Sequence, residues 1–241
     1  LGKMINGLPG LFAGMAVGVV ISVIVAFLVG LPTLRLKGDY LAIATLGVAE
    51  IIRVAVTNMK ITNGAAGISG VPLTNTWTIT YIALVLTTIL ILNYTFSSAG
   101  RATYAVLQDE IAAESMGVQV TKYKILAFVL GAATASIGGT LSATTLGAVT
   151  PSDFTFMKSI DVLIIVVFGG IGSFTGSFVA AVLLGIINLV LQPFGQLRMI
   201  IYAVALILIM IFRPGGLLGT WEFKLGDFKF SKKKETKESG K

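Results

Sequence analysis

The sequence of 241 residues contains no cysteine and no histidine. This chain can therefore form no disulfide, no Cys or His metal site, no Ser-His-Asp triad and no imidazole proton relay. Charged residues are also scarce, at 12% of the chain, whereas 55% of residues are hydrophobic and the mean hydropathy is +0.92. No cluster of acid, base and nucleophile stands out. We therefore predict no catalytic residue, no metal site and no cofactor, and a membrane enzyme is the least favoured class.

Apolar runs of about 17 to 25 residues recur along the chain, the length that a helix needs to cross a bilayer. They predict an all-α polytopic membrane protein embedded in a lipid bilayer. Gly10, Gly14 and Gly18 in the first run have the four-residue spacing typical of closely packed membrane helices. We expect about seven spans: 9–31, 40–58, 77–96, 125–149, two helices separated by the glycine-rich turn 169–176, and 199–212.

Basic residues orient these spans. The formal net charge is +7, and the seven Lys residues of the last 18 positions form a tail rather than a nucleic-acid-binding face. Seven spans place most other Lys and Arg residues on the side of this tail, which the positive-inside rule assigns to the cytoplasm. We expect a transmembrane domain over 1–220 and a basic cytoplasmic tail over 221–241. The same arrangement puts Leu1 outside, so we expect an additional N-terminal part with an odd number of spans.

The segment 100–124 is the long hydrophilic stretch of the chain. Its Ala-rich, helix-favouring background is interrupted by Arg101, Asp109, Glu110, Glu114, Lys122 and Lys124. A modest apolar stripe is supplied by Ala105, Leu107, Ile111 and Met116. A helix of this composition is too polar to cross a bilayer. It is expected to lie on the membrane surface, on the rest of the chain or on a soluble partner.

Glu50 and Arg53 lie inside the predicted span 40–58, three residues apart on one helix face. Ionisable residues within a membrane are costly and often functional, and this pair could contact the ammonium and carboxylate of a zwitterionic substrate. A mutual ion pair is the simpler interpretation and the one we favour, because a self-neutralised pair costs least in a low dielectric.

Six blocks of the sequence, taken in order, resemble the permease subunit of branched-chain amino acid ABC importers. They are GDYLAIATLGVAEIIRVAVTN, ITNGAAGISGVP, GRATYAVLQDEIAAESMGVQVTKYKILAFVLGA, PSDFTF, VFGGIGSFTG and IFRPGGLLG. The resemblance covers 32–219. It implies a second, related permease subunit, two cytoplasmic ATP-binding subunits, an extracytoplasmic substrate-binding protein and the bacterial plasma (inner) membrane. Leucine, isoleucine and valine are the implied cargo, and this chain would hydrolyse no ATP itself.

The same resemblance gives the segment 100–124 a role. Importer permeases carry a cytoplasmic loop with the motif Glu-Ala-Ala, three residues, Gly, whose short helices sit in a cleft of the ATPase. Here Ala112, Ala113 and Gly117 fit that spacing, with Ile111 at the Glu position and Glu110 one place earlier. The implied ATPase-coupling residues are Arg101, Asp109, Glu110, Ala112, Ala113, Glu114 and Gly117. The small alanines would permit close approach, Gly117 would end the helix, and the acidic groups would meet basic groups of the partner.

Several alternatives remain open from the residues. The segment could be a solvated amphipathic connector, and the same architecture could import urea, short amides or a sugar. A stand-alone channel or secondary transporter would instead bind a coupling ion at Glu50 or Asp161. The glycine-rich turn 169–176 lacks the Lys and the preceding strand of a P-loop, so we expect no ATP binding there.

Overall fold

The structure is a computed structural model that describes residues 7–170 and 172–191, together with 193, 204, 207 and 216. The chain divides into two compact units, Leu1–Phe156 and Met157–Lys241, and each is described by itself. The basic tail 221–241 and the predicted last span 199–212 lie outside the described residues, apart from single positions.

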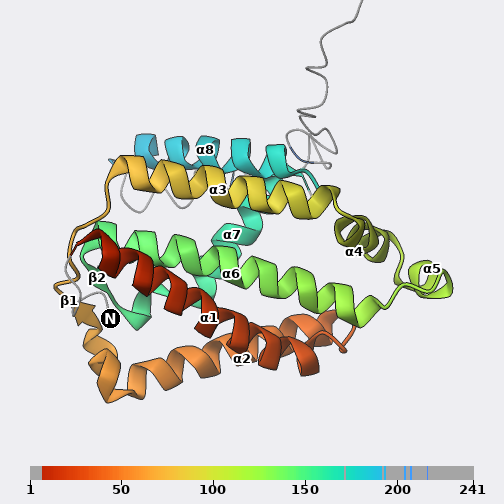
Figure 1. The fold of residues 1–241 in the computed structure, drawn as a ribbon, viewed down its shortest axis with the longest axis horizontal. Helices are drawn as coiled ribbons and strands as arrows, with labels where there is room; N and C mark the ends of the chain where they lie inside the picture. The colour runs from red at the N-terminus through yellow and green to blue at the C-terminus, as the bar shows by residue number, and fades with distance from the viewer. Residues whose placement is uncertain are drawn as a thin grey trace, which may run out of the picture. The chain divides into compact units, whose positions relative to one another are not determined.

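Helices form most of the first unit (Figure 1). They are α1 (Leu8–Thr33), α2 (Asp39–Asn58), α3 (Trp77–Phe96), α4 (Ser98–Gln108), α5 (Glu110–Ser115) and α6 (Val120–Leu146). Three short 3₁₀ turns cover Lys60–Thr62, Gly64–Ala66 and Pro151–Asp153. The two-residue strands β1 (Ile68–Ser69) and β2 (Ala148–Val149) pair antiparallel, with Ile68 opposite Val149.

The longest contact in this unit runs between α1 and α6, which pack antiparallel. The hydroxyl of Ser22 donates to the carbonyl of Ala132 at 2.9 Å, and a Cβ on Gly18 would lie 3.1 Å from the Ser136 hydroxyl. Gly18 therefore permits the close approach that the glycine spacing predicted. Gly14 is not at such a close contact, since a Cβ added there would meet nothing within 4 Å.

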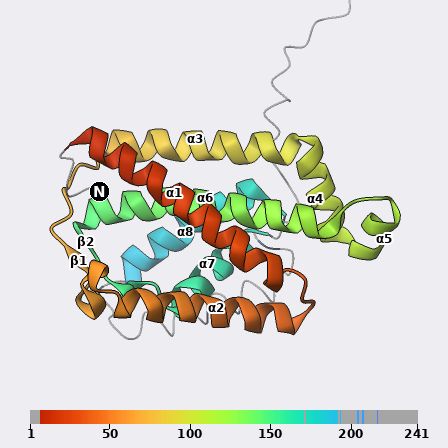
Figure 2. The ribbon, with the colours of Figure 1, turned by 60° about the horizontal axis from the view of Figure 1, so that its bottom comes forward.

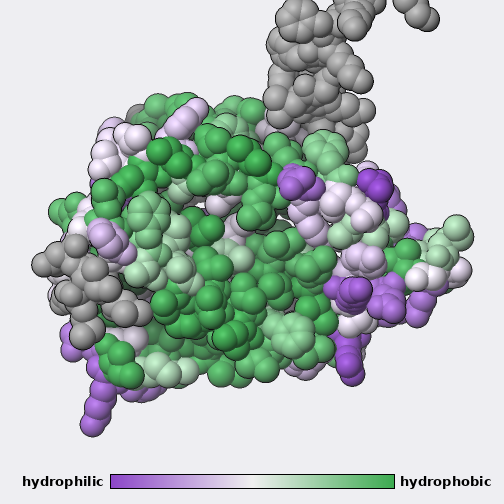
Figure 3. Space-filling view, in the orientation of Figure 1, coloured by the Kyte–Doolittle hydropathy of each residue, from purple (hydrophilic) through white to green (hydrophobic). Residues whose placement is uncertain are grey.

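The unit has two distinct ends (Figures 1 and 2). One end carries α4, α5, the start of α6 and the link between α1 and α2. The other carries the segment 59–76, the strand pair and the end of α6. Five of the seven Lys and Arg residues described in this unit lie at the first end: Arg35, Lys37, Arg101, Lys122 and Lys124. Hydrophilic residues accordingly gather around α4 and α5, whereas the face over α1, α2 and α6 is apolar (Figure 3).

The second unit begins along α7 (Phe156–Gly169) and continues through α8 (Phe174–Leu191). The two helices meet at Gly169 and Gly176, where a Cβ on either glycine would collide with the backbone of the other. Phe168, Ala180 and Leu184 form the buried cluster beside this contact. The predicted division of the long apolar run by a glycine-rich turn is therefore confirmed.

Within the described residues, five helices are long and apolar enough to cross a membrane, namely α1, α2, α3, α6 and α8. The chain is thus a mostly helical, multi-pass membrane protein. The predicted count of seven spans is not confirmed. The 14 residues of α7 extend about 21 Å, less than the roughly 30 Å hydrocarbon core, and the span 199–212 lies outside the described residues. The predicted start of the fourth span at residue 125 was also late, because α6 already begins at Val120.

Candidate functional site

A tight turn sets α4 at an angle to the end of α3. The Ser97 hydroxyl accepts a hydrogen bond from the backbone N–H of Gly100 at 3.1 Å and so caps the start of α4. A Cβ on Gly100 would collide with the carbonyl oxygen of Tyr94, so only glycine fits this position. Arg101 follows, and its guanidinium donates to the Phe96 carbonyl at 3.0 Å. The predicted coupling segment thus starts from a fixed geometry at the end of a span.

The segment was expected to be helical with a modest apolar stripe, and Asp109 divides it into two helices, α4 and α5. Asp109 has an extended backbone, and its carboxylate accepts from the N–H groups of Ile111 at 2.8 Å and Ala112 at 3.0 Å. Aspartate is among the best residues for this N-cap role because it satisfies two otherwise unpaired donors. The carboxylate predicted to meet a partner's basic group is therefore engaged in holding the helix start.

The C-terminus of α5 is closed as firmly. Gly117 has a φ of +81°, and its N–H donates to the carbonyl of Glu114 at 2.9 Å. The N–H of Val118 reaches the carbonyl of Ala113 at 3.0 Å, which completes a Schellman motif. The prediction that Gly117 ends the helix is confirmed. An isolated helix of six residues is unstable, so the two caps are what fix α5 in place.

Glu110 links α5 to the next helix. Its carboxylate pairs with the ammonium of Lys124 near the start of α6, and the two side chains are 37% and 20% exposed. Sequence reasoning directed Glu110 toward a partner and left Lys124 out of the site. The signal that could have found the pair is opposite charge on either side of a tight glycine turn.

The outer surface of α4 and α5 mixes apolar and charged side chains. Tyr104, Leu107, Ile111 and Met116 are exposed, Met116 by 85%. Exposed apolar side chains on a polar protrusion are typical of a surface that meets another protein. Of the two motif alanines, Ala112 lies on this surface, whereas Ala113 is 4% exposed and packs inward. Glu114 is exposed beside them.

The second predicted pair, Glu50 and Arg53, forms the favoured ion pair. The Nε of Arg53 donates to Glu50 at 2.9 Å, and a second bond joins its terminal nitrogen to the other carboxylate oxygen. Both residues lie on α2, which buries none of its side chains in the described chain. Asp161, the other residue considered for a coupling ion, has a carboxylate oxygen 3.8 Å from the ammonium nitrogen of Lys158, also on α7. Among the described residues, no group of three acidic side chains could hold a metal ion.

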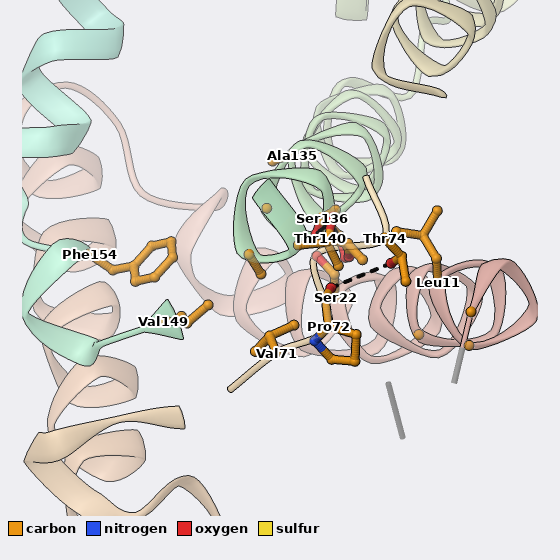
Figure 4. Close-up of a pocket in the computed structure, with 16 residues that line it drawn as sticks. Leu11, Ser22, Val71, Pro72, Thr74, Ala135, Ser136, Thr140, Val149 and Phe154 are labelled. Atoms are coloured by element: carbon orange, nitrogen blue, oxygen red, sulfur yellow. Dashed lines mark hydrogen bonds between the residues drawn. The ribbon is translucent and has the colours of Figure 1, made fainter. Parts of the chain in front are cut away.

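A cavity of about 480 Å³ opens between the first half of α1 and the second half of α6 (Figure 4). Val71, Pro72 and Thr74 line it from the loop before α3, while Phe154 lies on the side opposite Leu11. The remaining lining residues are small, apolar or hydroxylated: Gly7, Gly10, Gly14, Ser22, Ala135, Ser136, Gly139, Thr140, Ala143, Thr144 and Val149. None of the residues predicted as a site from the sequence lies here. The sequence signal that could have indicated the cavity is the set of small residues at 135, 139 and 143, which lie four apart on one face of the helix.

The loop over this cavity is held to α6 by neutral hydrogen bonds. The N–H of Val71 donates to the Gly147 carbonyl at 2.9 Å. The side-chain amide of Asn75 donates to the hydroxyls of Thr80 at 2.9 Å and Thr145 at 2.7 Å. The cavity wall on this side is therefore anchored at two points.

Comparison with known proteins identifies the family. Residues 2–212 match the family described as branched-chain amino acid transport system / permease component. The chain belongs to this family. It is 36% identical to the high-affinity branched-chain amino acid transport system permease protein LivM of Salmonella typhimurium, over 82% of this chain and 55% of the relative. It is also 36% identical to LivM of Escherichia coli, over 80% of this chain and 53% of that protein.

The chain is also 30% identical to the high-affinity branched-chain amino acid transport system permease protein LivH of Escherichia coli, over 59% of this chain and 46% of that protein. The chain spans about half the length of the LivM proteins it matches. No solved structure matches it significantly. Within this chain, the predicted coupling residues gather on α4 and α5, and Glu50 and Arg53 form a separate pair on α2.

Proposed function

We propose that this chain is a permease subunit of an ATP-driven importer of leucine, isoleucine and valine in the bacterial plasma (inner) membrane. It would work with a second permease subunit, two ATP-binding subunits and an extracytoplasmic substrate-binding protein. ATP hydrolysis would belong to the ATP-binding subunits, and this chain would convert their closure into movement of its spans. The end with α4 and α5 would face the cytoplasm, since it carries most of the basic residues.

The observation that carries this proposal is the construction of α5. A short helix capped by Asp109 and Gly117 presents exposed Ile111 and Met116 outward and is paired through Glu110 to α6. Such an element can dock on a soluble subunit and pass its displacement to the membrane. Arg101, Ala112, Ala113 and Glu114 complete the proposed coupling element.

Movement of α5 would reach the span interior through α6. Lys124 lies at the start of this helix, and α6 packs along α1 through Ser22 and Gly18. Because packed helices resist local deformation, displacement of one end is expected to shift α1 and α6 together. Alternating access would follow when the membrane helices rock about the cargo path.

Branched-chain amino acids are favoured as cargo because the matched relatives are named for their transport. Two hypotheses compete with this one. The first is the same architecture with urea, short amides or a sugar as cargo, and the second is a stand-alone channel or secondary transporter. Each predicts a different response to solute and to ATP.

The test is reconstitution of the complete permease with its partner subunits in lipid vesicles. We would measure ATP hydrolysis and uptake of labelled leucine, with and without the substrate-binding protein. We expect leucine-loaded binding protein to stimulate both. Stimulation by urea or a sugar alone would contradict the cargo, and uptake that proceeds without ATP would contradict the importer mechanism.

A further inference from the structure

We propose that the cavity between α1 and α6 receives the aliphatic side chain of the cargo during transport. This inference rests on the proposed function and adds a site to it. The cavity volume of about 480 Å³ falls within the roughly 300 to 1,000 Å³ typical of small-molecule sites.

The chemistry of the lining favours an uncharged, apolar occupant. None of the described residues that line the cavity carries a charge. Most of its hydroxyl donors are used within the chain: Thr140 donates to the Ser136 carbonyl at 2.9 Å, and Thr144 donates to the Thr140 carbonyl at 3.0 Å. Ser22 likewise donates across to Ala132. A sugar or urea needs donors as well as acceptors, so these walls suit an alkyl group better.

The uncharged lining also determines how an amino acid would sit. Its ammonium and carboxylate would be left without charged partners inside the cavity, at a large desolvation cost. We therefore infer that only the side chain enters and that the charged groups remain at the mouth, in contact with water or another subunit.

The cavity lies at the end of the first unit away from the coupling element. Gly139 follows Val120, the first residue of α6, by 19 positions, or roughly 28 Å along the helix. The orientation proposed above places this end toward the extracytoplasmic side, where a binding protein would release its cargo. The cavity is thus in position to accept the cargo early in transport.

Two adjacent glycines of α6 provide a matched pair of variants. A Cβ at Gly138 or at Gly139 would meet nothing within 4 Å, but only Gly139 lines the cavity. Gly139→Leu should fill the cavity without a clash in its own helix and lower leucine uptake about tenfold, the equivalent of about 1.4 kcal/mol. Gly138→Leu should leave uptake within about twofold of the unmodified permease. Gly14→Leu, which enters the cavity from α1, should reproduce the loss.

A labelling experiment tests occupancy directly. Because residues 1–241 contain no cysteine, Gly139→Cys and Gly138→Cys each introduce a single thiol into this part of the subunit. In the reconstituted assembly with cysteine-free partners, leucine-loaded binding protein should slow modification of Gly139→Cys by a small thiol reagent at least about threefold. Modification of Gly138→Cys should not change. Equal protection of both sites, or of neither, would overturn the inference.

The outcomes separate this inference from the proposed function. If leucine stimulates ATP hydrolysis in the unmodified assembly while Gly139→Leu and Gly14→Leu transport normally, the cavity is not on the path and the importer remains. If leucine has no effect on ATP hydrolysis or uptake by the unmodified assembly, leucine is not the cargo, and the proposed function is overturned together with this inference.

Discussion

The two ends of the first unit are held together by different chemistry. At the α4–α5 end, Asp109 caps a helix and Glu110 pairs with Lys124 across two elements. At the cavity end, the amide of Asn75 donates to the hydroxyls of Thr80 and Thr145, and the strands β1 and β2 pair. One end uses charge to fix an exposed protrusion. The contacts at the other end are mostly neutral, apart from the Asp153 carboxylate, which accepts from the N–H and the hydroxyl of Thr150.

This difference matches the two tasks we propose. A charged contact survives on a water-facing element, where it fixes orientation more than it adds stability. Along a cargo path, an unpaired charge would bind the wrong groups and resist dehydration. The predictions below are designed to break one end while the other stays intact.

The largest effect is expected from Gly117→Pro. Proline cannot adopt the φ of +81° found here, and it removes the N–H that binds the Glu114 carbonyl. Leucine uptake should be lost while the protein still inserts in the membrane and remains monodisperse in detergent. Gly117→Asn is the matched control, because asparagine tolerates a left-handed backbone and keeps its N–H. Normal uptake by Gly117→Pro would refute the coupling role of α5.

Reversal of the Glu110 and Lys124 charges tests the link between α5 and α6. Glu110→Lys alone should place two cations together and lower uptake about tenfold, with less uptake per ATP hydrolysed. Adding Lys124→Glu should restore most of the loss, because the pair can form again with opposite polarity. If the double variant transports as poorly as Glu110→Lys alone, Glu110 acts on a partner subunit rather than through Lys124.

The sequence was sufficient for the elements defined by long apolar runs. The range of α3 was predicted to the residue, and the glycine-rich turn between α7 and α8 followed from the length limit on one span. Composition could not give the start of α6, because Lys122 and Lys124 are polar yet continue the helix. Long basic side chains can extend toward water from the end of a span, so their charge does not mark the helix start.

The candidate site was only partly predictable for a similar reason. The motif spacing located α5 and its end at Gly117. It could not show that Asp109 and Glu110 are already engaged within the chain, since those contacts depend on where the backbone turns. The small residues at 135, 139 and 143 mark one face of α6, but the cavity also depends on how α1 lies against that face, which is a tertiary contact.

A smaller effect is expected at the start of α5. Asp109→Ala should remove the cap and destabilise the helix by about 1 kcal/mol, which corresponds to a loss of a few-fold in coupled uptake. Asp109→Asn should retain nearly full uptake, because asparagine caps as well as aspartate. Equal loss in both variants would instead assign the negative charge itself to a partner contact. Uptake and ATP hydrolysis measured side by side distinguish these results.

The smallest effect is expected from the double variant Glu50→Gln, Arg53→Gln. The pair neutralises itself within α2, and no described contact joins it to the cavity or to the coupling element. Removing both charges together leaves no unpaired ion in the span, so leucine uptake should stay within about twofold. Either single variant should do worse, because it leaves one charge alone in a membrane helix. Loss of uptake in the double variant, with normal insertion, would show that the pair acts on the cargo or on a coupling ion. Transport would then depend on charged side chains in α2 as well as at the α4–α5 end.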